Sequence, residues 1–394
     1  MKRLFVIASL AILAVGCQKT EIQNEVQTPI GFSTEVGKQT KAIVTPVDNE
    51  TQAVHLINQP FAVYAYGYQL KKNADGSLSS ERVANSTSYP MKNVEIVYKE
   101  GAWKAEASQG AYYWPNDPTT RLDFYAYSPY IDSPDLTTDK APSVDDVDKV
   151  MTVTSLSHSE ANGLVFDGYT HSTESMYVDF MEATPVKGAT YNHADGNPNG
   201  TETTGTVPMT FNHKMTQIVF NVTTDNPYPG ITFTIQSITL NGVANTGAYN
   251  NGTWEATGSD DFLIFPADSD NGAVLVNPSS SSDSTVEDVV ALKYEANATT
   301  VLDGMKTTGV TMIPQELEAS TQKFTIVYEV KGNGVATETV TKTVDLYKDR
   351  ASANIWASNK KITYKVMIGL NEIKFEPVVA NWTSQTGNEY TFQQ

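Results

Sequence analysis

The chain has 394 residues, which is long for a single hydrophobic core, and this length predicts two or three domains, of which we take two. It carries 45 acidic and 27 basic residues, a formal net charge of −18, so its surface would repel nucleic acids and anionic membranes. Only one cysteine is present, which excludes a fold held together by disulfides within the chain. Stability must therefore come from buried apolar area.

Residues 1–16 have the pattern of an export signal. A basic start precedes about a dozen apolar residues, too few for the roughly 20 that a membrane-spanning helix needs. Small residues lead directly into Cys17, which resembles a bacterial lipobox except that Ala14 fills the position of the usual large aliphatic residue. This resemblance implies signal cleavage between Gly16 and Cys17 and a diacylglyceryl lipid on Cys17. Residues 17–28 are polar and are expected to form a flexible tether.

Residues 29–37 alternate apolar and polar side chains, as a strand that closes one side of a core should. Ile30, Phe32 and Val36 fall on one face of this strand. Burying these side chains is worth about 5–8 kcal/mol, at about 1.5–3 kcal/mol each. Loss of the strand would leave an apolar groove with unpaired backbone, and such an edge captures other strands.

Period-two alternation recurs along the rest of the chain and predicts half-buried strands rather than helices. These strands are expected at residues 61–68, 122–130, 176–182, 216–224, 231–240, 261–267, 324–330, 338–346 and 361–370. Gly, Asn, Asp and Pro residues separate them. The fold class is therefore predicted to be all-β, built of antiparallel β-sandwiches.

A polar stretch rich in glycine and proline interrupts this pattern at residues 187–205. It is expected to be a linker or a long surface excursion. The N-terminal β-sandwich domain would then cover residues 29–190, and the C-terminal β-sandwich domain residues 206–394. Two further polar stretches, at 133–149 and 277–288, are expected to be loops within these domains.

No constellation of catalytic or metal-binding residues stands out. The five histidines are scattered without the short spacings of zinc ligands, and the acidic run at 139–148 lacks the glycine and glutamate of an EF-hand loop. No G-x-S-x-G, phosphate-loop or G-x-G-x-x-G motif occurs. We therefore expect no metal, no cofactor and no enzyme activity. A pair of carboxylates for glycoside hydrolysis needs no short motif, so that alternative stays open.

Several stretches, taken in chain order, resemble the fimbrillin-like proteins, which are the subunits of type V pili in anaerobic Gram-negative bacteria. These stretches are "IGFSTEVGKQTKA" (30–42), "VPMTFNHKMTQIVFNV" (207–222), "ITLNGVANTGAYNNGTWEA" (238–256), "MIPQEL" (312–317) and "YKVMIGLNEIKFEPVVANW" (364–382). The resemblance implies two tandem transthyretin-like antiparallel β-sandwich domains. It also implies export as a lipoprotein to the outer membrane and the cell surface.

The same resemblance implies assembly by strand exchange. In the family, a trypsin-like protease cuts after a basic residue near the N-terminus, and a strand of a neighbouring subunit fills the groove that is left. The matching position here is Lys41-Ala42, with Lys where many relatives carry Arg. The removable strand would be 29–37. The donor strand would lie within residues 371–394, where Ile373 with Phe375, or Tyr390 with Phe392, supplies the apolar face.

The resulting hypothesis is a structural subunit of a cell-surface pilus that supports adhesion. Its partners would be other pilus subunits, the trypsin-like protease and, through the lipid anchor, the outer membrane. If Lys41 is an ordinary loop residue instead, the protein would stay attached by its lipid as an anchor subunit. The alternative function is a surface glycan-binding lipoprotein of a polysaccharide-uptake system, for which the 20 tyrosines would have to form an exposed aromatic platform.

Overall fold

The computed structural model describes residues 28–36, 60–132, 151–172, 178–224, 230–266, 273–275, 310–332, 334, 336–348, 354–369 and 373–381. The elements in these ranges are 24 β-strands and one 3-10 turn at Ala107–Gln109. The all-β fold class expected from the sequence is thereby confirmed. None of the described ranges contains a helix that is long and apolar enough to cross a membrane.

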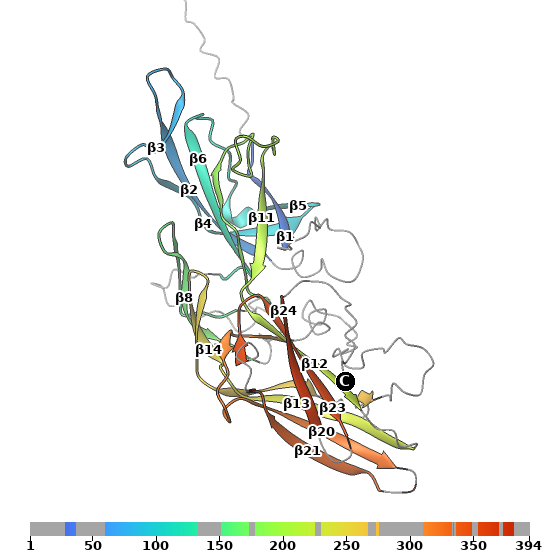
Figure 1. The fold of residues 1–394 in the computed structure, drawn as a ribbon. Coiled ribbons are helices and arrows are strands. Elements are labelled where there is room, and N and C mark those ends of the chain that lie inside the picture. Colours follow the sequence, from blue (N-terminus) through green and yellow to red (C-terminus); the bar gives the residue numbers. More distant parts are fainter. Residues whose placement is uncertain are drawn as a thin grey trace, which may run out of the picture.

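Nine strands form a sheet at one end of the molecule (Figure 1). Their order is β10 (Val186–Ala189), β6 (Thr120–Ser128), β9 (Met181–Ala183), β11 (Thr206–His213), β1 (Gly31–Val36), β5 (Ala102–Ala105), β4 (Ser88–Lys99), β2 (Phe61–Lys72) and β3 (Leu78–Arg82). Because β2 also pairs with β6, the strands from β6 to β2 follow one another around a closed ring.

The ring encloses a hydrophobic core. On β2, Phe61 and Val63 point into this core, together with Phe124 on β6 and Phe211 on β11. The alternate residues of β2 point outward, yet Tyr64 and its neighbours on that face are buried as well. The expectation of a half-buried strand is therefore wrong for β2, because a further layer covers its outer face.

That further layer is a four-stranded sheet in the order β15 (Thr253–Thr257), β14 (Thr246–Asn250), β8 (Gly163–Thr170) and β7 (Ser155–Ser159). Phe166 on β8 stacks on Tyr249 of β14, with ring centroids 5.2 Å apart. Both pack in one cluster with Tyr64 and Tyr127 from the outer face of the ring. Since β8 and β14 lie on opposite sides of the expected linker, this cluster joins the two halves of the chain.

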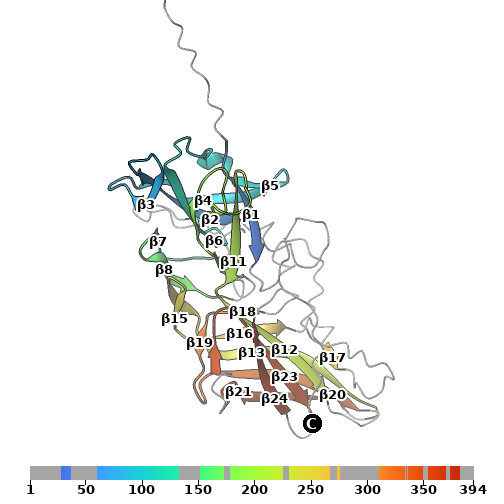
Figure 2. The same cartoon turned by 45° about the horizontal axis from the view of Figure 1, so that its top comes forward.

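Two sheets pack face to face at the other end of the molecule (Figures 1 and 2). One has the order β18 (Val310–Met312), β12 (Thr216–Thr224), β23 (Lys360–Ile368) and β24 (Ile373–Asn381). The other has the order β16 (Asp260–Pro266), β13 (Ile231–Val243), β20 (Lys323–Gly332) and β21 (Glu338–Asp345), with β17 (Ala273–Leu275) also on β13. A two-stranded sheet of β19 (Gln315–Glu316) and β22 (Ile355–Trp356) completes the described strands.

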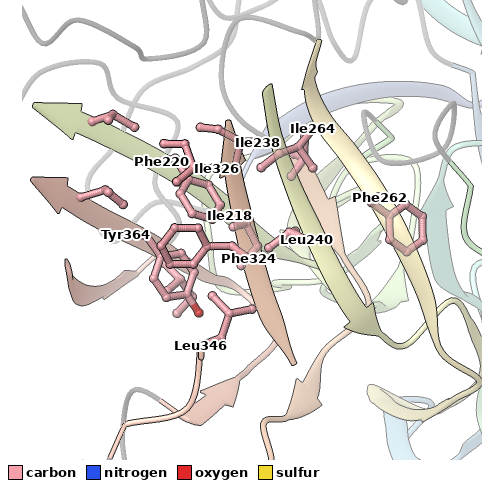
Figure 3. Close-up of a cluster of buried hydrophobic side chains, with 14 of the residues drawn as sticks. Ile218, Phe220, Ile238, Leu240, Phe262, Ile264, Phe324, Ile326, Leu346 and Tyr364 are labelled. Atoms are coloured by element: carbon pink, nitrogen blue, oxygen red, sulfur yellow. The ribbon is translucent and has the colours of Figure 1, made fainter. Parts of the chain in front are cut away.

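The core of this sandwich is built from the inward residues of both sheets. Figure 3 shows Phe220 of β12 and Tyr364 of β23 side by side and facing Phe324 of β20. Phe220 lies 5.2 Å from the ring of Tyr364 and 5.2 Å from that of Phe324, measured between centroids. Most strand pairs are antiparallel, as expected, but β12 runs parallel to β23 and β1 runs parallel to β11.

The boundary between ring and sandwich falls elsewhere than the polar stretch suggested. Residues 206–213, expected to open the C-terminal domain, form β11 in the ring. Within 187–205, backbone hydrogen bonds such as Gly205 N–H to Tyr191 O at 2.7 Å hold the chain in place, and Ala194 is fully buried. This segment is therefore a hydrogen-bonded excursion of the ring. The division into two domains stays a prediction.

β11 passes into β12 through two residues, Lys214 and Met215. The Lys214 N–H donates to the carbonyl of Phe180 at 2.8 Å, and the Lys214 carbonyl accepts from Trp254 Nε1 at 2.7 Å. The Lys214 ammonium pairs with Glu182 at 3.2 Å, and Met215 is fully buried. The connection between ring and sandwich is thus fixed by contacts with three other strands or loops.

Candidate strand-exchange groove

β1 lies beside β11 although about 170 residues separate them in sequence, as both views of the fold make clear (Figures 1 and 2). The two strands run parallel, from Gly31 opposite Thr206 to Val36 opposite Phe211. A parallel partner so distant in sequence can be exchanged without breaking a hairpin, because no short turn joins the two strands.

On its other side, β1 meets two short pieces of chain. The Ile30 N–H donates to the carbonyl of Tyr112 at 2.9 Å. Further along, Phe32 pairs antiparallel with Trp103 of β5, which is the only residue pair between β1 and β5 within the described ranges. β1 therefore closes a ring that would stay open between β11 and β5 without it.

The inward side chains of β1 fill the gap in the ring. Ile30, Phe32 and Thr34 are only 6%, 5% and 6% exposed. The ring of Phe32 stands edge-on to Phe61 and to Phe124, at 6.0 Å from each centroid. The alternation seen in the sequence thus corresponds to an apolar inner face, and the side chain of Val36 lies outside the described residues.

One carbonyl group, that of Gly205, accepts the hydrogen bond that holds the start of β1. Gly205 O accepts from the Gly31 N–H at 3.0 Å and from Trp114 Nε1 at 3.1 Å. Gly205 has φ +78°, and a Cβ there would meet the ring of Tyr191 at 3.1 Å. A glycine is required at this point, so this acceptor is held in a fixed position beside the first residue of β1.

The residues expected to be processed lie outside the described ranges. They are Gly16 and Cys17 at the signal junction and Lys41 and Ala42 at the expected maturation site. β1 ends at Val36, so Lys41 follows it five positions later in the sequence. Their expected roles stay predictions.

The expected donor segments fall partly in β24. Ile373 is the first residue of β24 and packs against the core of the sandwich, and of Phe375 the structure describes the backbone alone. β24 pairs antiparallel with β23 along its whole length, from Ile373 opposite Ile368 to Asn381 opposite Lys360, at the edge of its sheet. Tyr390 and Phe392 lie outside the described residues.

Two histidines lie in enclosed surroundings, His171 fully buried and His158 half-buried. His171 lies between the hydroxyl of Tyr169 at 2.8 Å and the carbonyl of Thr311 at 2.9 Å, so Nε2 donates and Nδ1 accepts. The hydroxyl of Tyr66 donates to the backbone carbonyl of His158 at 2.9 Å and lies 2.8 Å from Nδ1 of the same residue. Burial lowers the pKa of each imidazole to about 4. No group of three metal-ligating residues occurs in the described part of the chain.

The residues that contact β1 from its neighbouring segments were not predicted from the sequence. Trp103 and Trp114 were expected only to be core residues beside strands, and both are indeed buried. Their contacts with β1 could not be predicted because their partners are distant in sequence. Gly205 gave no signal either, since it is one of several glycines in a polar stretch.

A family model described as fimbrillin-like matches residues 40–382 of this chain. The chain belongs to the fimbrillin-like family. A relative, the fimbrium subunit Fim1C of Phocaeicola vulgatus, is 23% identical over 410 residues, which cover 99% of this chain and 98% of the relative. The crystal structure of a fimbrial protein from Bacteroides vulgatus has the same fold, with a TM-score of 0.53, 19% identity, and coverage of 90% of this chain and 100% of that one.

Membership of the fimbrillin-like family agrees with the resemblance seen in the sequence. The family is one of fimbrial proteins and not of enzymes, so the chain is not an enzyme. The aromatic residues give the alternative function little support. Among the described tyrosines, the exposed ones are Tyr89, Tyr113 and Tyr191, while those of β2 and β6 are buried.

Proposed function

We propose that this fimbrillin-like protein is a structural subunit of a cell-surface pilus and polymerises when a strand of another subunit replaces β1. The position of β1 is the observation that supports this proposal most directly. β1 is the first described strand, it closes the ring between β11 and β5, and it buries Ile30 and Phe32. The name of the relative in Phocaeicola vulgatus, a fimbrium subunit, supports the same function.

Removal of β1 would leave an unpaired strand edge in the ring and would expose hydrophobic side chains of its core. β11 would lose its parallel partner, and the aromatic residues under Phe32 would face water. Reburial of two large apolar side chains contributes about 3–6 kcal/mol, and a full set of backbone hydrogen bonds adds to it. A groove of this kind binds a strand from another molecule by β-strand addition.

Cleavage after Lys41 by a trypsin-like protease would start this exchange. The cut falls after the C-terminal end of β1 and before β2, so it separates β1 from the remainder of the chain without cutting within a strand of the ring. We place the donor strand within residues 371–394, with Ile373 and Phe375, or Tyr390 and Phe392, as its apolar face. An uncut subunit would keep its groove closed and serve as an anchor.

Before cleavage, the subunit would be an outer-membrane lipoprotein. Signal removal between Gly16 and Cys17 and lipidation of Cys17 would tether it at the cell surface through residues 17–28. The lipobox resemblance supports this step. A Cys17→Ser variant should fail to incorporate radiolabelled palmitate in the native host, and incorporation by that variant would contradict the assignment.

Limited trypsin digestion tests the pilus function. The chain without its signal should yield a core that begins at Ala42, identified by mass spectrometry, and this core should elute as larger species in size-exclusion chromatography. Because trypsin can also cut after Lys38, the matched control is a variant with both Lys38→Ala and Lys41→Ala, which should remain monomeric under the same digestion. A core that forms, loses the β1 fragment and still stays monomeric would rule out assembly by strand exchange.

A further inference from the structure

A cavity of about 470 Å³ lies between the β14–β15 hairpin and the two-stranded sheet of β19 and β22. β15 and β19 contact each other beside it (Figure 2). One wall belongs to the sheet that covers the ring, and the other belongs, through the buried Trp356, to the core of the sandwich. Cavities of about 300–1,000 Å³ at such boundaries are where proteins bind small molecules. The size and the place of this cavity are therefore those of a small-molecule site.

The two walls are joined at the carbonyl of Lys214, in the connection between β11 and β12. Trp254 Nε1 donates to this oxygen from the hairpin wall, at 2.7 Å. Ser358 Oγ donates to it from the opposite wall, at 3.1 Å. Both donor residues line the cavity. One acceptor thus fixes the spacing of the walls at their base, so little conformational entropy is lost when a ligand binds between them.

Gln322 presents an amide group to the cavity. Its side chain is 8% exposed, and its Oε1 accepts from the Glu318 N–H at 2.8 Å. Because the Glu318 N–H needs an acceptor, the oxygen must take that side and the NH₂ group the other. No atom in the described part of the chain accepts from this NH₂ group, and Gln322 lines the cavity. An enclosed donor of this kind favours a ligand that brings an acceptor oxygen.

Glu316 is the only charged residue among the described residues that line the cavity. Its ionised carboxylate can only accept hydrogen bonds, and it repels anionic ligands such as phosphates and uronic acids. The hydroxyl of Thr253 lies in the same lining and can both donate and accept. A ligand with several hydroxyl groups therefore satisfies Glu316, Gln322 and Thr253 together. One carboxylate is not the pair that glycoside hydrolysis needs, so the chemistry of this site is binding.

The rest of the lining is apolar. Ile355 on β22 is 46% exposed, and Pro314 and Ala256 lie with it in the lining. The indole of Trp254 lines the cavity as well. A sugar ring has hydroxyl groups at its edges and a face of C–H groups, and this face packs on aliphatic and aromatic side chains. An apolar wall with a few polar groups thus matches both parts of a sugar ring.

We propose that this junction cavity binds a neutral sugar of one or two rings. Glu316 accepts from hydroxyl groups of the sugar, Gln322 donates to another of its oxygens, and Ile355 packs on its C–H face. The site is separate from strand exchange, because none of the described lining residues belongs to β1, β11 or β5. A polymer of such subunits carries one sugar site per subunit, so it would hold a chain of repeating sugars at many points.

Saturation-transfer NMR of the uncut chain without its signal tests this site. The probes are the methyl glycosides of glucose, galactose, mannose and N-acetylglucosamine, with that of glucuronic acid as the anionic comparison. At least one neutral glycoside should receive saturation, with a Kd in the millimolar range, and the glucuronide should not. Lack of transfer to all four neutral glycosides would overturn the proposal, and so would preferential binding of the glucuronide.

Two substitutions at exposed positions locate the site. Glu316→Ala and Ile355→Ala should each raise the Kd of the bound glycoside by about 10-fold, through one lost hydrogen bond or a few lost apolar contacts. Glu338→Ala is the matched control, since this exposed carboxylate on β21 is not in the lining, and it should leave the Kd unchanged. Equal Kd values in all three variants and the wild type would place the sugar elsewhere and overturn the proposal.

Assembly after trypsin digestion separates the cavity from the groove. The digested Glu316→Ala chain should assemble to the same extent as the digested wild type, because Glu316 does not pair with β1. Assembly that is lost with this substitution would make the cavity a contact between subunits and would overturn the proposal. Binding of lysine methyl ester in place of the glycosides would make the cavity an amine site, which would overturn it as well.

Discussion

Asp123 on β6 is a charged residue with no exposure to solvent. Its carboxylate accepts from the Gly188 N–H at 2.7 Å and from the Arg82 guanidinium at 2.9 Å. Burial raises the pKa of Asp123, while the hydrogen bond from Gly188 and the charge of Arg82 lower it. Arg82 also lies 3.6 Å over the ring of Tyr68, so one side chain ties the β3 hairpin to the ring.

An Arg82→Ala substitution should destabilise the protein by about 3 kcal/mol, because it leaves the buried carboxylate without its counter-charge. The pKa of Asp123 would rise further above its unfolded value. The folded state would then bind more protons than the unfolded state, so the loss should be larger at pH 7 than at pH 4. Urea unfolding of the wild-type and variant proteins at the two pH values measures this loss of stability. Lys71→Ala, which removes one partner of an exposed ion pair, is the control and should change the stability little.

His158 and His171 give a second pH dependence, of opposite sign to that of Asp123. His158 and His171 have pKa values of about 4 in the folded state, against 6.5 for a free imidazole, because burial disfavours their charged form. The unfolded state therefore binds more protons between these values, and stability should fall as the pH falls from about 6.5 toward 4. We expect a loss of up to about 2–3 kcal/mol per histidine.

Urea unfolding midpoints at pH 7.5, 6.0 and 5.0 measure this loss before most carboxylates titrate. The decrease should be smaller in a His158→Asn variant, relative to its own value at pH 7.5. Midpoints that stay constant over this range would contradict the neutral state of both imidazoles.

At the scale of single elements, alternation in the sequence was informative wherever a strand carries large apolar residues at every second position. β1, β2, β6, β12 and β13 were all predicted within a few residues of their bounds. Short strands of mixed polarity, such as β5 and β7, gave no such signal. Pairing partners could not be predicted, because the pleat determines which face a side chain takes and not which strand lies beside it.

In the candidate groove, too, the strand itself was predicted from the sequence and its pairing partners were not. The sequence alone indicated a strand at 29–37 with Ile30 and Phe32 inward, and the structure has this arrangement. The parallel pairing with β11 and the slot formed by Phe61 and Phe124 depend on contacts between residues far apart in sequence. Such contacts are a property of the closed ring.

A Phe32→Ala substitution should weaken the docking of β1 by about 3–5 kcal/mol, since it empties the aromatic slot. After cleavage at Lys41, the fragment that contains β1 should then leave the ring more rapidly. Size-exclusion chromatography of the digested protein at successive times measures fragment retention. Ser33→Ala, at an exposed position of the same strand, is the control and should change stability by less than about 0.5 kcal/mol.

At the scale of the whole molecule, the ring and the sandwich are not independent units on a flexible tether. The sheet of β7, β8, β14 and β15 contributes to a core shared with the outer face of the ring. The polar stretch at 190–205 is held by its own backbone hydrogen bonds, among them Thr203 N–H to Asn192 O at 3.0 Å. Composition identified this stretch as polar, but it could not reveal that the backbone is paired.

Limited proteolysis with a protease of broad specificity should therefore leave residues 190–205 intact in the folded protein. The same segment should be cut readily in urea, which provides the control for its intrinsic susceptibility. Mass spectrometry of the fragments identifies the cleavage sites. Early cleavage inside 190–205 under native conditions would restore the interpretation as an open linker.

The two-residue connection at Lys214 and Met215 has a mechanical consequence. β11, which runs parallel to β1, continues through this connection into β12, which runs parallel to β23. A pull along a strand seated in the groove would stress the hydrogen bonds of the β11 pair in shear, all at once instead of one after another. The tension would then pass into the nine-residue length of β12 and from there to β23, without an extensible segment between. A fibre of such subunits would be stiff along its axis.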